Sequence, residues 1–395
     1  MRWGRTPEQQ HLVDTVREFA SRHVAPVAPD LDRQPNPADC FSWAIVEEAS
    51  RLGIRTLTLA QEYGGAGVDS LTAAMVIEEL ARADLGVSVI FAQTLKIAQT
   101  LQRACTPEQA RQFLPAFARN DRGLLAIAIT EPDVSSDYII PFDHPTAQFR
   151  TTAVRADGTW VLNGRKHFIS NGNRAMLYLV FAQTDRSASL VHGSTCFLVP
   201  RETPGFSIGR VHDKMGERLV NNAELVFQDC RVPDAQVLGR VNDGFALLRE
   251  FFPASNAYAA ASVLGVAQAA YERTLQWTRT RAQGGRRLID HDTTAADLAE
   301  MRMLIDAARA YVYVAASEAD RTGGMDPTLG ALPKVFAARV AWRVVTRALE
   351  LHGGYGYMRE TGVEKLVRDA AAFLHSDGAN RSLLLKAARF IRDGP

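Results

Sequence analysis

The spacing of apolar residues changes twice along this chain, and this limits the folds it can adopt. Up to about residue 120, and again from residue 239, apolar residues recur at helical intervals. Between these parts, residues 124–129 form a short continuous apolar run that predicts a buried strand. The C-terminal stretches are rich in alanine, and such helices pack closely in antiparallel bundles. The chain is therefore predicted to be a multidomain α+β protein with an N-terminal helical domain (1–123), a middle β-barrel-like domain (124–238) and a C-terminal four-helix bundle (239–395).

Local signals punctuate these segments. Thr6 can cap a first helix and Pro7 suits its first turn. In the middle segment, three dipeptides typical of hairpin turns separate strand-like runs: Asp157-Gly158, Asn163-Gly164 and Asn171-Gly172. These signals predict a helical start and a small β domain of short strands.

Composition limits the kinds of partner. The 395 residues are 47% hydrophobic and 23% charged, as in an ordinary globular protein, and the formal net charge is +1. Because no long block has one sign of charge, nothing favours nucleic acid or an acidic membrane surface. The four cysteines lack the spacing of zinc or disulfide sites, and no apolar run approaches the roughly 20 residues of a membrane span. We expect a cytoplasmic protein without a metal or a membrane span.

A glycine-rich run near the C-terminus, residues 352–357, is the first candidate for a ligand site. Its three glycines have no Cβ to keep the backbone away from a flat or phosphorylated ligand, and their amides can donate hydrogen bonds. Further on, Arg368 and Asp369 are expected to form an ion pair, and the carboxylate of Asp377 precedes Gly378. A dinucleotide is the expected ligand. The alternative is a plain loop between two helices.

Two polar motifs in the middle segment are further candidates. Residues 128–137 join the end of the expected strand to a loop that contains Thr130, and such a strand end can present amides and hydroxyls to a ring system. Residues 162–172 contain Phe168 and Ser170. The alternatives are a capped turn for the first motif and, for the second, a structural hairpin with Phe168 in the core.

Taken together, these motifs resemble those of the acyl-CoA dehydrogenase superfamily, in the same order along nearly the whole chain. The resemblance implies an FAD-dependent enzyme in which Asp377 removes the α-proton of an acyl thioester. It also implies that Phe168 stacks on the isoalloxazine ring and that Ser170 lies near the flavin N5. Arg281 is expected to reach the FAD pyrophosphate of a neighbouring subunit, which implies a dimer or homotetramer.

The resemblance extends to other positions around the expected site. The further cofactor-binding positions are Ile129, Thr130, Ser136, Glu350, Gly353, Gly354 and Ala379. The substrate-binding positions are Ser136, Phe252, Ser255, Asn256 and Gly378.

Several positions depart from the residues usual in the superfamily. Asp377 is one methylene shorter than the usual glutamate, although some branches, nitroalkane oxidases among them, use an aspartate. The other departures are Ser135 for glycine, Ser255-Asn256 for Glu-Arg, Gly284 for phenylalanine, Glu350 and Arg381 for glutamine, and Ala379 for threonine. These changes predict an altered cofactor pocket or an unusual substrate.

Three functions are therefore compatible with the sequence. The first is α,β-dehydrogenation of an acyl-CoA thioester, with electrons leaving to an electron-transfer flavoprotein or another acceptor. The second is a specialised branch that acts on an acyl-carrier-protein thioester or another unusual acyl group, or that carries out flavin oxidase or monooxygenase chemistry. The third is a degenerate flavoprotein subunit of a hetero-oligomer.

Overall fold

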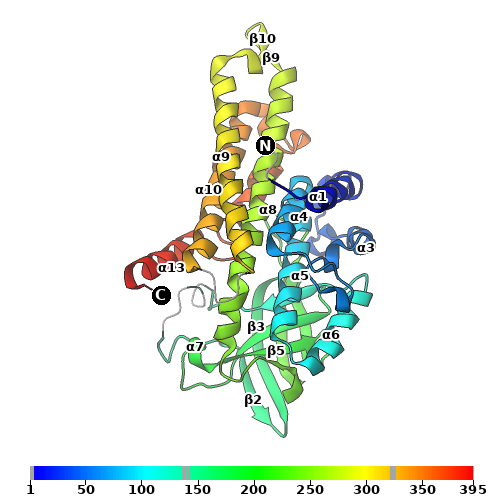
Figure 1. Ribbon diagram of the computed structural model, residues 1–395, viewed down its shortest axis with the longest axis vertical. Helices are drawn as coiled ribbons and strands as arrows, with labels where there is room; N and C mark the ends of the chain where they lie inside the picture. The colour runs from blue at the N-terminus through cyan, green and yellow to red at the C-terminus, as the bar shows by residue number, and fades with distance from the viewer. Residues whose placement is uncertain (1–3, 136–138, 140–142, 321–325, 395) are drawn as a thin grey trace.

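A helical bundle lies at one end of the elongated molecule, and a sheet flanked by further helices lies at the other (Figure 1). The computed structural model describes residues 4–135, 139, 143–320 and 326–394. The predicted start of the first helix is confirmed, because Thr6 and Gln9 cap it reciprocally in front of Pro7. The N-terminal elements are α1 (Pro7–Phe19), η1 (Ala20–Val24), α2 (Ala28–Asp32), η2 (Pro37–Cys40), α3 (Trp43–Arg51), η3 (Ile54–Thr56), η4 (Gln61–Tyr63), α4 (Ser70–Ala83), α5 (Leu85–Ala104) and α6 (Pro107–Arg119).

The middle of the chain forms an eight-stranded sheet in the order β6-β7-β3-β2-β4-β5-β8, with β1 parallel to β4. Its elements are β1 (Leu125–Ala128), β2 (Thr152–Ala156), β3 (Thr159–Ser170), β4 (Leu177–Gln183), α7 (Leu190–Gly193), β5 (Ser194–Pro200), β6 (Phe206–Val211), β7 (Asn222–Pro233), η6 (Asp234–Gln236) and β8 (Val237–Leu238). The strand predicted at 124–129 is confirmed as β1, which is buried between other elements.

Two of the three predicted turns are confirmed, and one is wrong. Asp157-Gly158 joins β2 to β3, and a turn begins at Asn171 where β3 ends. Asn163-Gly164 instead lies inside β3, where the pairing with β7 shifts register. A Cβ on Gly164 would lie 2.5 Å from the Cα of Thr151, so this glycine permits a close approach of two strands rather than a turn.

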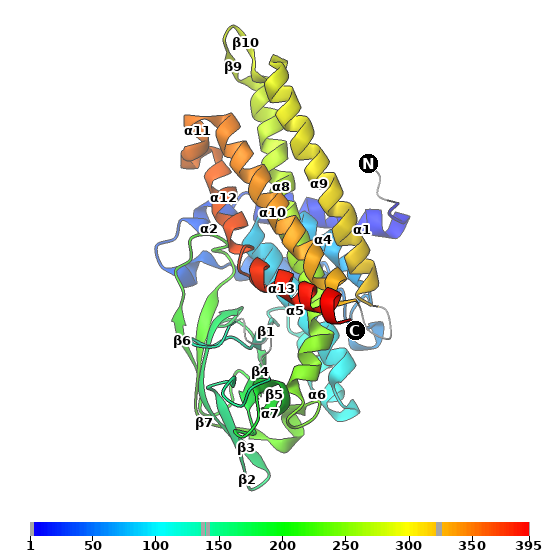
Figure 2. The ribbon, with the colours of Figure 1, turned by 90° about the vertical axis from the view of Figure 1, so that its left-hand side faces the viewer.

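The last part of the chain is a helical bundle, so the predicted order of helices, sheet and helices is confirmed. Its elements are α8 (Gly244–Thr280), β9 (Ala282–Gln283), β10 (Arg286–Arg287), η7 (Leu288–Asp290), α9 (Asp292–Glu318), α10 (Pro327–His352), α11 (Gly354–Tyr357), η8 (Arg359–Thr361), α12 (Val363–Ala372) and α13 (Asn380–Asp393). Helix α13 packs against α10 on the side of the bundle nearer the sheet (Figure 2). None of the helices in the described part of the chain is long and apolar enough to cross a membrane.

N-terminal helices and helices of the bundle share one hydrophobic core. Side chains from α1, α4, α5, α8, α9, α10 and α12 pack into it, and a second core joins α5, α6 and the start of α8 to the sheet. Helix α8 approaches α4 so closely that a Cβ on Gly265 would lie 2.3 Å from the carbonyl oxygen of Glu78. Because α5 and α8 belong to both cores, they fix the sheet relative to the bundle.

Substitution of Gly265 by alanine tests this packing. We expect Gly265→Ala to lower the unfolding temperature by several degrees, because overpacking a helix contact costs about 1–3 kcal/mol. Gly330→Ala is the matched control inside α10, where the added Cβ would lie 3.8 Å from its nearest neighbour. This control should leave the unfolding temperature unchanged or raise it. Equal effects of the two substitutions would contradict the close approach of α8 to α4.

Candidate active site

A cavity of about 670 Å³ lies where the sheet meets the bundle. The ends of β1 and β3 form one wall, and α5, the start of α8 and the segment after α12 form the others. The lining side chains include Gln93, Ile129, Thr130, Phe168, Ser170, Phe251, Phe252, His375, Asp377, Gly378 and Ala379. The cavity is therefore built from segments that are far apart in the sequence.

Asp377 occupies a strained position in this cavity. Its φ is +50°, a left-handed conformation that costs a non-glycine residue about 1–3 kcal/mol and marks a position held by its surroundings. Its Oδ1 accepts hydrogen bonds from Lys96 Nζ at 2.7 Å and from Ser255 Oγ at 3.1 Å. The Asp377 side chain is 16% exposed, whereas that of Lys96 is only 2% exposed. The carboxylate therefore faces the cavity while its cationic partner is buried behind it.

Lys334 donates hydrogen bonds to the segment that carries Asp377. Its Nζ donates to the carbonyl oxygens of Phe373 at 2.9 Å and Gly378 at 2.7 Å, and to Asn380 Oδ1 at 3.0 Å. Burial lowers the pKa of Lys334 to about 7, although the charge of Asp377 opposes this shift. One buried amine thus connects both ends of the turn between α12 and α13.

A buried ion pair fixes the end of β1. Lys166 on β3 contacts Glu131 at 2.7 Å, and both side chains are fully buried. The same Nζ donates to the carbonyl oxygen of Ile129, and the Glu131 carboxylate accepts the backbone N–H groups of Arg150 and Thr151. Glu131 therefore has a structural role, which leaves Thr130 and Ile129 at the cavity wall.

An exposed aromatic ring forms part of the same wall. Phe168 has a φ of +59°, and its side chain is 59% exposed, so the alternative that it belongs to the core is wrong. It packs beside His167 and His212, and burial lowers the pKa of His212 to about 4. His167 Nδ1 and His212 Nε2 are buried and have no hydrogen-bond partner among the described residues. An exposed ring on a strained backbone, beside buried polar atoms without a described partner, is typical of a surface that binds a ligand.

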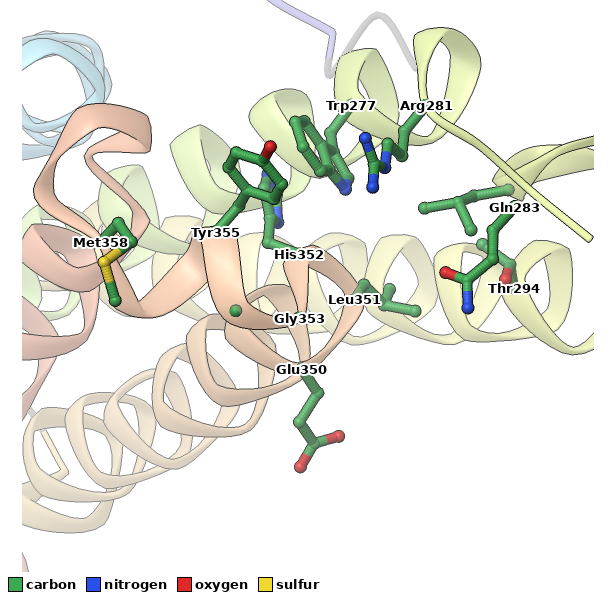
Figure 3. Close-up of a pocket in the computed structure, with 12 residues that line it drawn as sticks. Trp277, Arg281, Gln283, Thr294, Glu350, Leu351, His352, Gly353, Tyr355 and Met358 are labelled. Carbon is green, nitrogen blue, oxygen red and sulfur yellow. The ribbon is translucent and has the colours of Figure 1, made fainter.

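A second cavity, of about 540 Å³, lies at the glycine-rich run. The guanidinium of Arg281 lies over the rings of Trp277 and Tyr355, at 5.8 Å and 5.3 Å from their centroids (Figure 3). The Trp277 ring also stacks on His352 with a centroid distance of 5.0 Å. A Cβ on Gly353 or Gly354 would meet no described atom within 4 Å, so the backbone there is open to a ligand.

The predicted site residues fall into these two cavities, with three exceptions. Ile129, Thr130, Phe168, Ser170, Phe252, Asp377, Gly378 and Ala379 line the first cavity, and Arg281, Glu350, Gly353 and Gly354 line the second. Ser255 and Asn256 are buried in α8 and line neither, although Ser255 contacts Asp377. Ser136 lies outside the described residues. In the second cavity, Glu350 pairs with Arg347 and points away from the Trp277 and Arg281 side chains (Figure 3).

Three residues that belong to no recognised motif contribute to the two sites. Trp277 lines the second cavity, whereas Lys96 and Lys334 contact the Asp377 segment from outside the first. One signal could have found the two lysines. That signal is rarity, because the chain has only six lysines among its 45 basic residues. In the structure, none of the six is exposed. A lysine in this chain therefore marks an internal position.

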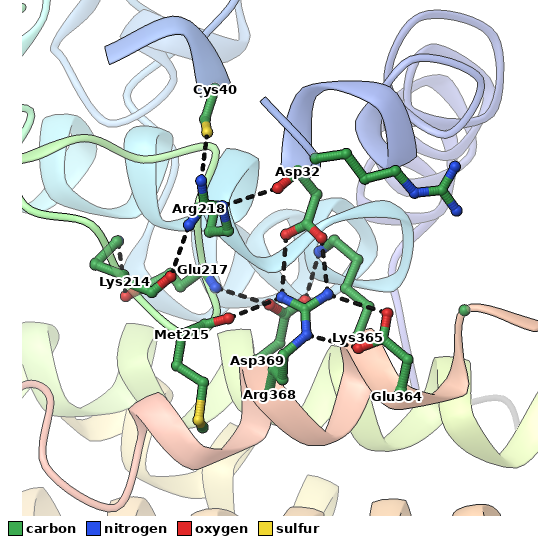
Figure 4. A network of polar contacts seen from close by, with 12 residues as sticks. Asp32, Cys40, Lys214, Met215, Glu217, Arg218, Glu364, Lys365, Arg368 and Asp369 are labelled. Atoms are coloured by element: carbon green, nitrogen blue, oxygen red, sulfur yellow. Dashed lines mark hydrogen bonds and ion pairs between the residues drawn. The ribbon is translucent and has the colours of Figure 1, made fainter. Parts of the chain in front are cut away.

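The predicted ion pair between Arg368 and Asp369 is wrong. Arg368 instead pairs with Asp32 at 2.7 Å and with Glu364 at 2.6 Å, and Asp369 accepts from Lys365 at 2.6 Å (Figure 4). Consecutive helix residues point in different directions, so the two side chains cannot face each other. Asp369 also accepts the backbone N–H of Glu217, which ties α12 to the loop between β6 and β7.

Comparison with protein-family models gives three adjoining matches. Residues 6–121 match the acyl-CoA dehydrogenase N-terminal domain, 126–230 the middle domain and 242–391 the C-terminal domain. The matches cover most of the chain in a single family order.

Individual relatives agree with these models. A short-chain-specific acyl-CoA dehydrogenase of Megasphaera elsdenii is 33% identical over 389 residues, which cover 98% of each chain. The solved structure of butyryl-CoA dehydrogenase from the same organism has a TM-score of 0.92 at 32% identity, covering 99% of this chain and 100% of that one. The structure of the prolyl acyl carrier protein oxidase AnaB has a TM-score of 0.88 at 25% identity, covering 98% and 100%.

Replacement of Lys334 tests how the Asp377 segment is held. We expect Lys334→Met to destabilise the protein, because an acceptor left buried without a donor costs about 1–3 kcal/mol. The deficit relative to wild type should grow as the pH rises from about 7 to about 10, because the unfolded lysine still binds a proton there and the folded one does not. Thermal unfolding of both proteins across this pH range measures the difference in their stability. A deficit that shrinks over the same range would contradict the lowered pKa of Lys334.

Proposed function

Because the chain belongs to the acyl-CoA dehydrogenase family, we propose that it is an FAD-dependent dehydrogenase of an acyl thioester with Asp377 as its base. Members of this family are FAD-dependent oxidoreductases. The observation that carries the proposal is the position of Asp377. Its backbone is strained, and its carboxylate faces a cavity whose opposite wall holds Thr130, Phe168 and Ser170.

The residues of both cavities fit FAD. Phe168 offers an exposed ring on which a flat heterocycle can stack, and the hydroxyls of Thr130 and Ser170 lie on the same wall. In the second cavity, Gly353 and Gly354 leave the backbone open, and Arg281 brings a permanent positive charge suited to a diphosphate. FAD, when bound, supplies the acceptor for the β-hydride of the substrate.

The chain itself supplies the base and apolar side chains near it. An α-proton beside a thioester is weakly acidic, so its removal requires a positioned carboxylate away from bulk water. Phe251, Phe252 and Ile129 line part of the cavity with apolar side chains. The Asp377 carboxylate would take the α-proton, and loss of the β-hydride to bound FAD would leave a carbon–carbon double bond between the two carbons. An electron-transfer flavoprotein or another acceptor would then reoxidise the enzyme.

An anaerobic titration followed in the visible spectrum tests this function. We expect an acyl thioester to bleach the flavin band of the wild-type holoprotein. Asp377→Asn should slow bleaching about 10²–10⁴-fold, the usual contribution of a general base. Asp393→Asn, a surface change near the C-terminus, is the control and should have no effect. Undiminished bleaching by Asp377→Asn would contradict the base assignment, and a colourless protein would favour a degenerate subunit.

A carrier-protein thioester is the second candidate substrate. The similarity to the prolyl acyl carrier protein oxidase favours it, as do the aspartate at 377 and the alanine at 379. The same titration separates the candidates. A yellow protein that is bleached by a carrier-protein thioester, but not by the corresponding CoA thioester, would establish the second.

We infer a dimer or homotetramer from the surface of the bundle. The two cavities have no lining residue in common, and the family resemblance leads us to expect that Arg281 reaches the FAD of a neighbouring subunit. The bundle also exposes large apolar side chains on three helices: Met303 and Val314 on α9, Phe336 and Trp342 on α10, and Leu385 and Ile391 on α13. A second copy that covered these side chains would remove them from water.

Light scattering during size-exclusion chromatography tests the assembly. We expect the holoprotein to elute with two or four times the 43.4 kDa mass of one chain. Trp342→Glu should shift the mass towards the monomer, because it would bury a charge in the interface. A wild-type holoprotein that is monomeric at micromolar concentration would contradict this inference.

A further inference from the structure

Lys96 is a buried lysine whose ammonium is paired inside the protein. It lies on α5 between the fully buried Leu95 and Ile97, and its side chain is 2% exposed. Its ammonium donates to Asp377 Oδ1 at 2.7 Å and to Ser255 Oγ at 2.9 Å, and it lies 5.3 Å from the centroid of the Phe251 ring. Burying an ammonium is costly unless it is paired and hydrogen-bonded, so this position is specified by its partners.

The donors around Asp377 converge on one of its two oxygens. Lys96 and Ser255 both reach Oδ1, and Ser255 is itself held by Lys96. No described residue donates a hydrogen bond to Oδ2. Lys96 and Ser255 do not line the cavity, whereas Asp377 does. The arrangement therefore anchors one oxygen from behind and leaves the other for a ligand.

We propose that Lys96 is a positioning residue for the base: through Oδ1 it orients the Asp377 carboxylate, keeps it ionised and leaves Oδ2 free to take a proton from the substrate. A nearby cation favours the charged form of a carboxylate. This proposal rests on the proposed role of Asp377 as the base.

Other charged groups also act on Asp377, and they limit what Lys96 alone can do. Lys334 on α10 and Glu217 on the loop between β6 and β7 interact electrostatically with Asp377, and Lys214 on that loop and Arg368 on α12 line the same cavity. His375 lies on the same segment as Asp377. Of these groups, Lys96 is the one whose ammonium makes a direct hydrogen bond with the Asp377 carboxylate in the described structure.

The pH dependence of flavin bleaching in Lys96→Met tests the proposal. We expect the acid limb of the profile to move up by about 1–3 pH units, the usual effect of removing an adjacent charge. Bleaching at neutral pH should fall and recover as the pH rises. Thr94→Val is the matched control, because Thr94 is buried on the same helix and its hydroxyl bonds only to the carbonyl oxygen of Ile90 among the described residues. An acid limb that stays in place in Lys96→Met would overturn the proposal.

A stability cycle keeps the proposal testable without any thioester. Lys96→Met should lower the unfolding temperature at pH 8, because it leaves a charge unpaired in a buried site. Adding Asp377→Asn should restore most of the loss, since the double variant has no charge to bury. Additive losses would overturn the coupling. If no thioester bleaches the wild type, the proposed function fails, and restoration in the double variant still establishes the Lys96–Asp377 link. If Lys96→Met does not fold, folding of the double variant gives the same answer.

Discussion

The site depends on the position of one short carboxylate. Asp377 must point this carboxylate into the cavity while its backbone adopts a left-handed conformation, which is uncommon for residues other than glycine. Asp377 has a φ of +50°, and three segments act together to maintain it. Lys96 on α5 and Ser255 on α8 hold Oδ1, while Lys334 on α10 holds the backbone on either side. Strain of this kind persists only where the surroundings over-determine it.

The rest of the fold brings these segments together. Helix α8 packs along α4, α5, α9 and α10, so the bundle and the N-terminal helices share a single core. The sheet then contributes the opposite wall through the ends of β1 and β3, where the buried Lys166–Glu131 pair fixes Thr130. Arg368 pairs with Asp32 on α2 (Figure 4), and Lys365 pairs with Asp84 between α4 and α5, so both ion pairs join α12 to the N-terminal part of the chain. Each wall of the cavity therefore has its own rigid support.

Much of this could be predicted from the sequence, because periodicity and short motifs are local. The helical, β and helical order and the start of α1 depend on neighbouring residues alone. The turn expected at Asn163-Gly164 was wrong because pairing with β7 decides that strand's path. Lys96 could not be assigned a role, because its partner is 281 positions away and no motif joins them. Arg368 and Asp369 are adjacent in sequence, yet the helix turns them towards different partners.

A crystal structure of the holoprotein with a bound acyl thioester would test directly whether Asp377, held by Lys96, is the base. We expect the α-carbon of the acyl group to lie between Oδ2 of Asp377 and the flavin ring, with the ammonium of Lys96 still on Oδ1. An α-carbon out of reach of Asp377, or a Lys96 side chain that leaves the carboxylate to bind the substrate, would contradict the account.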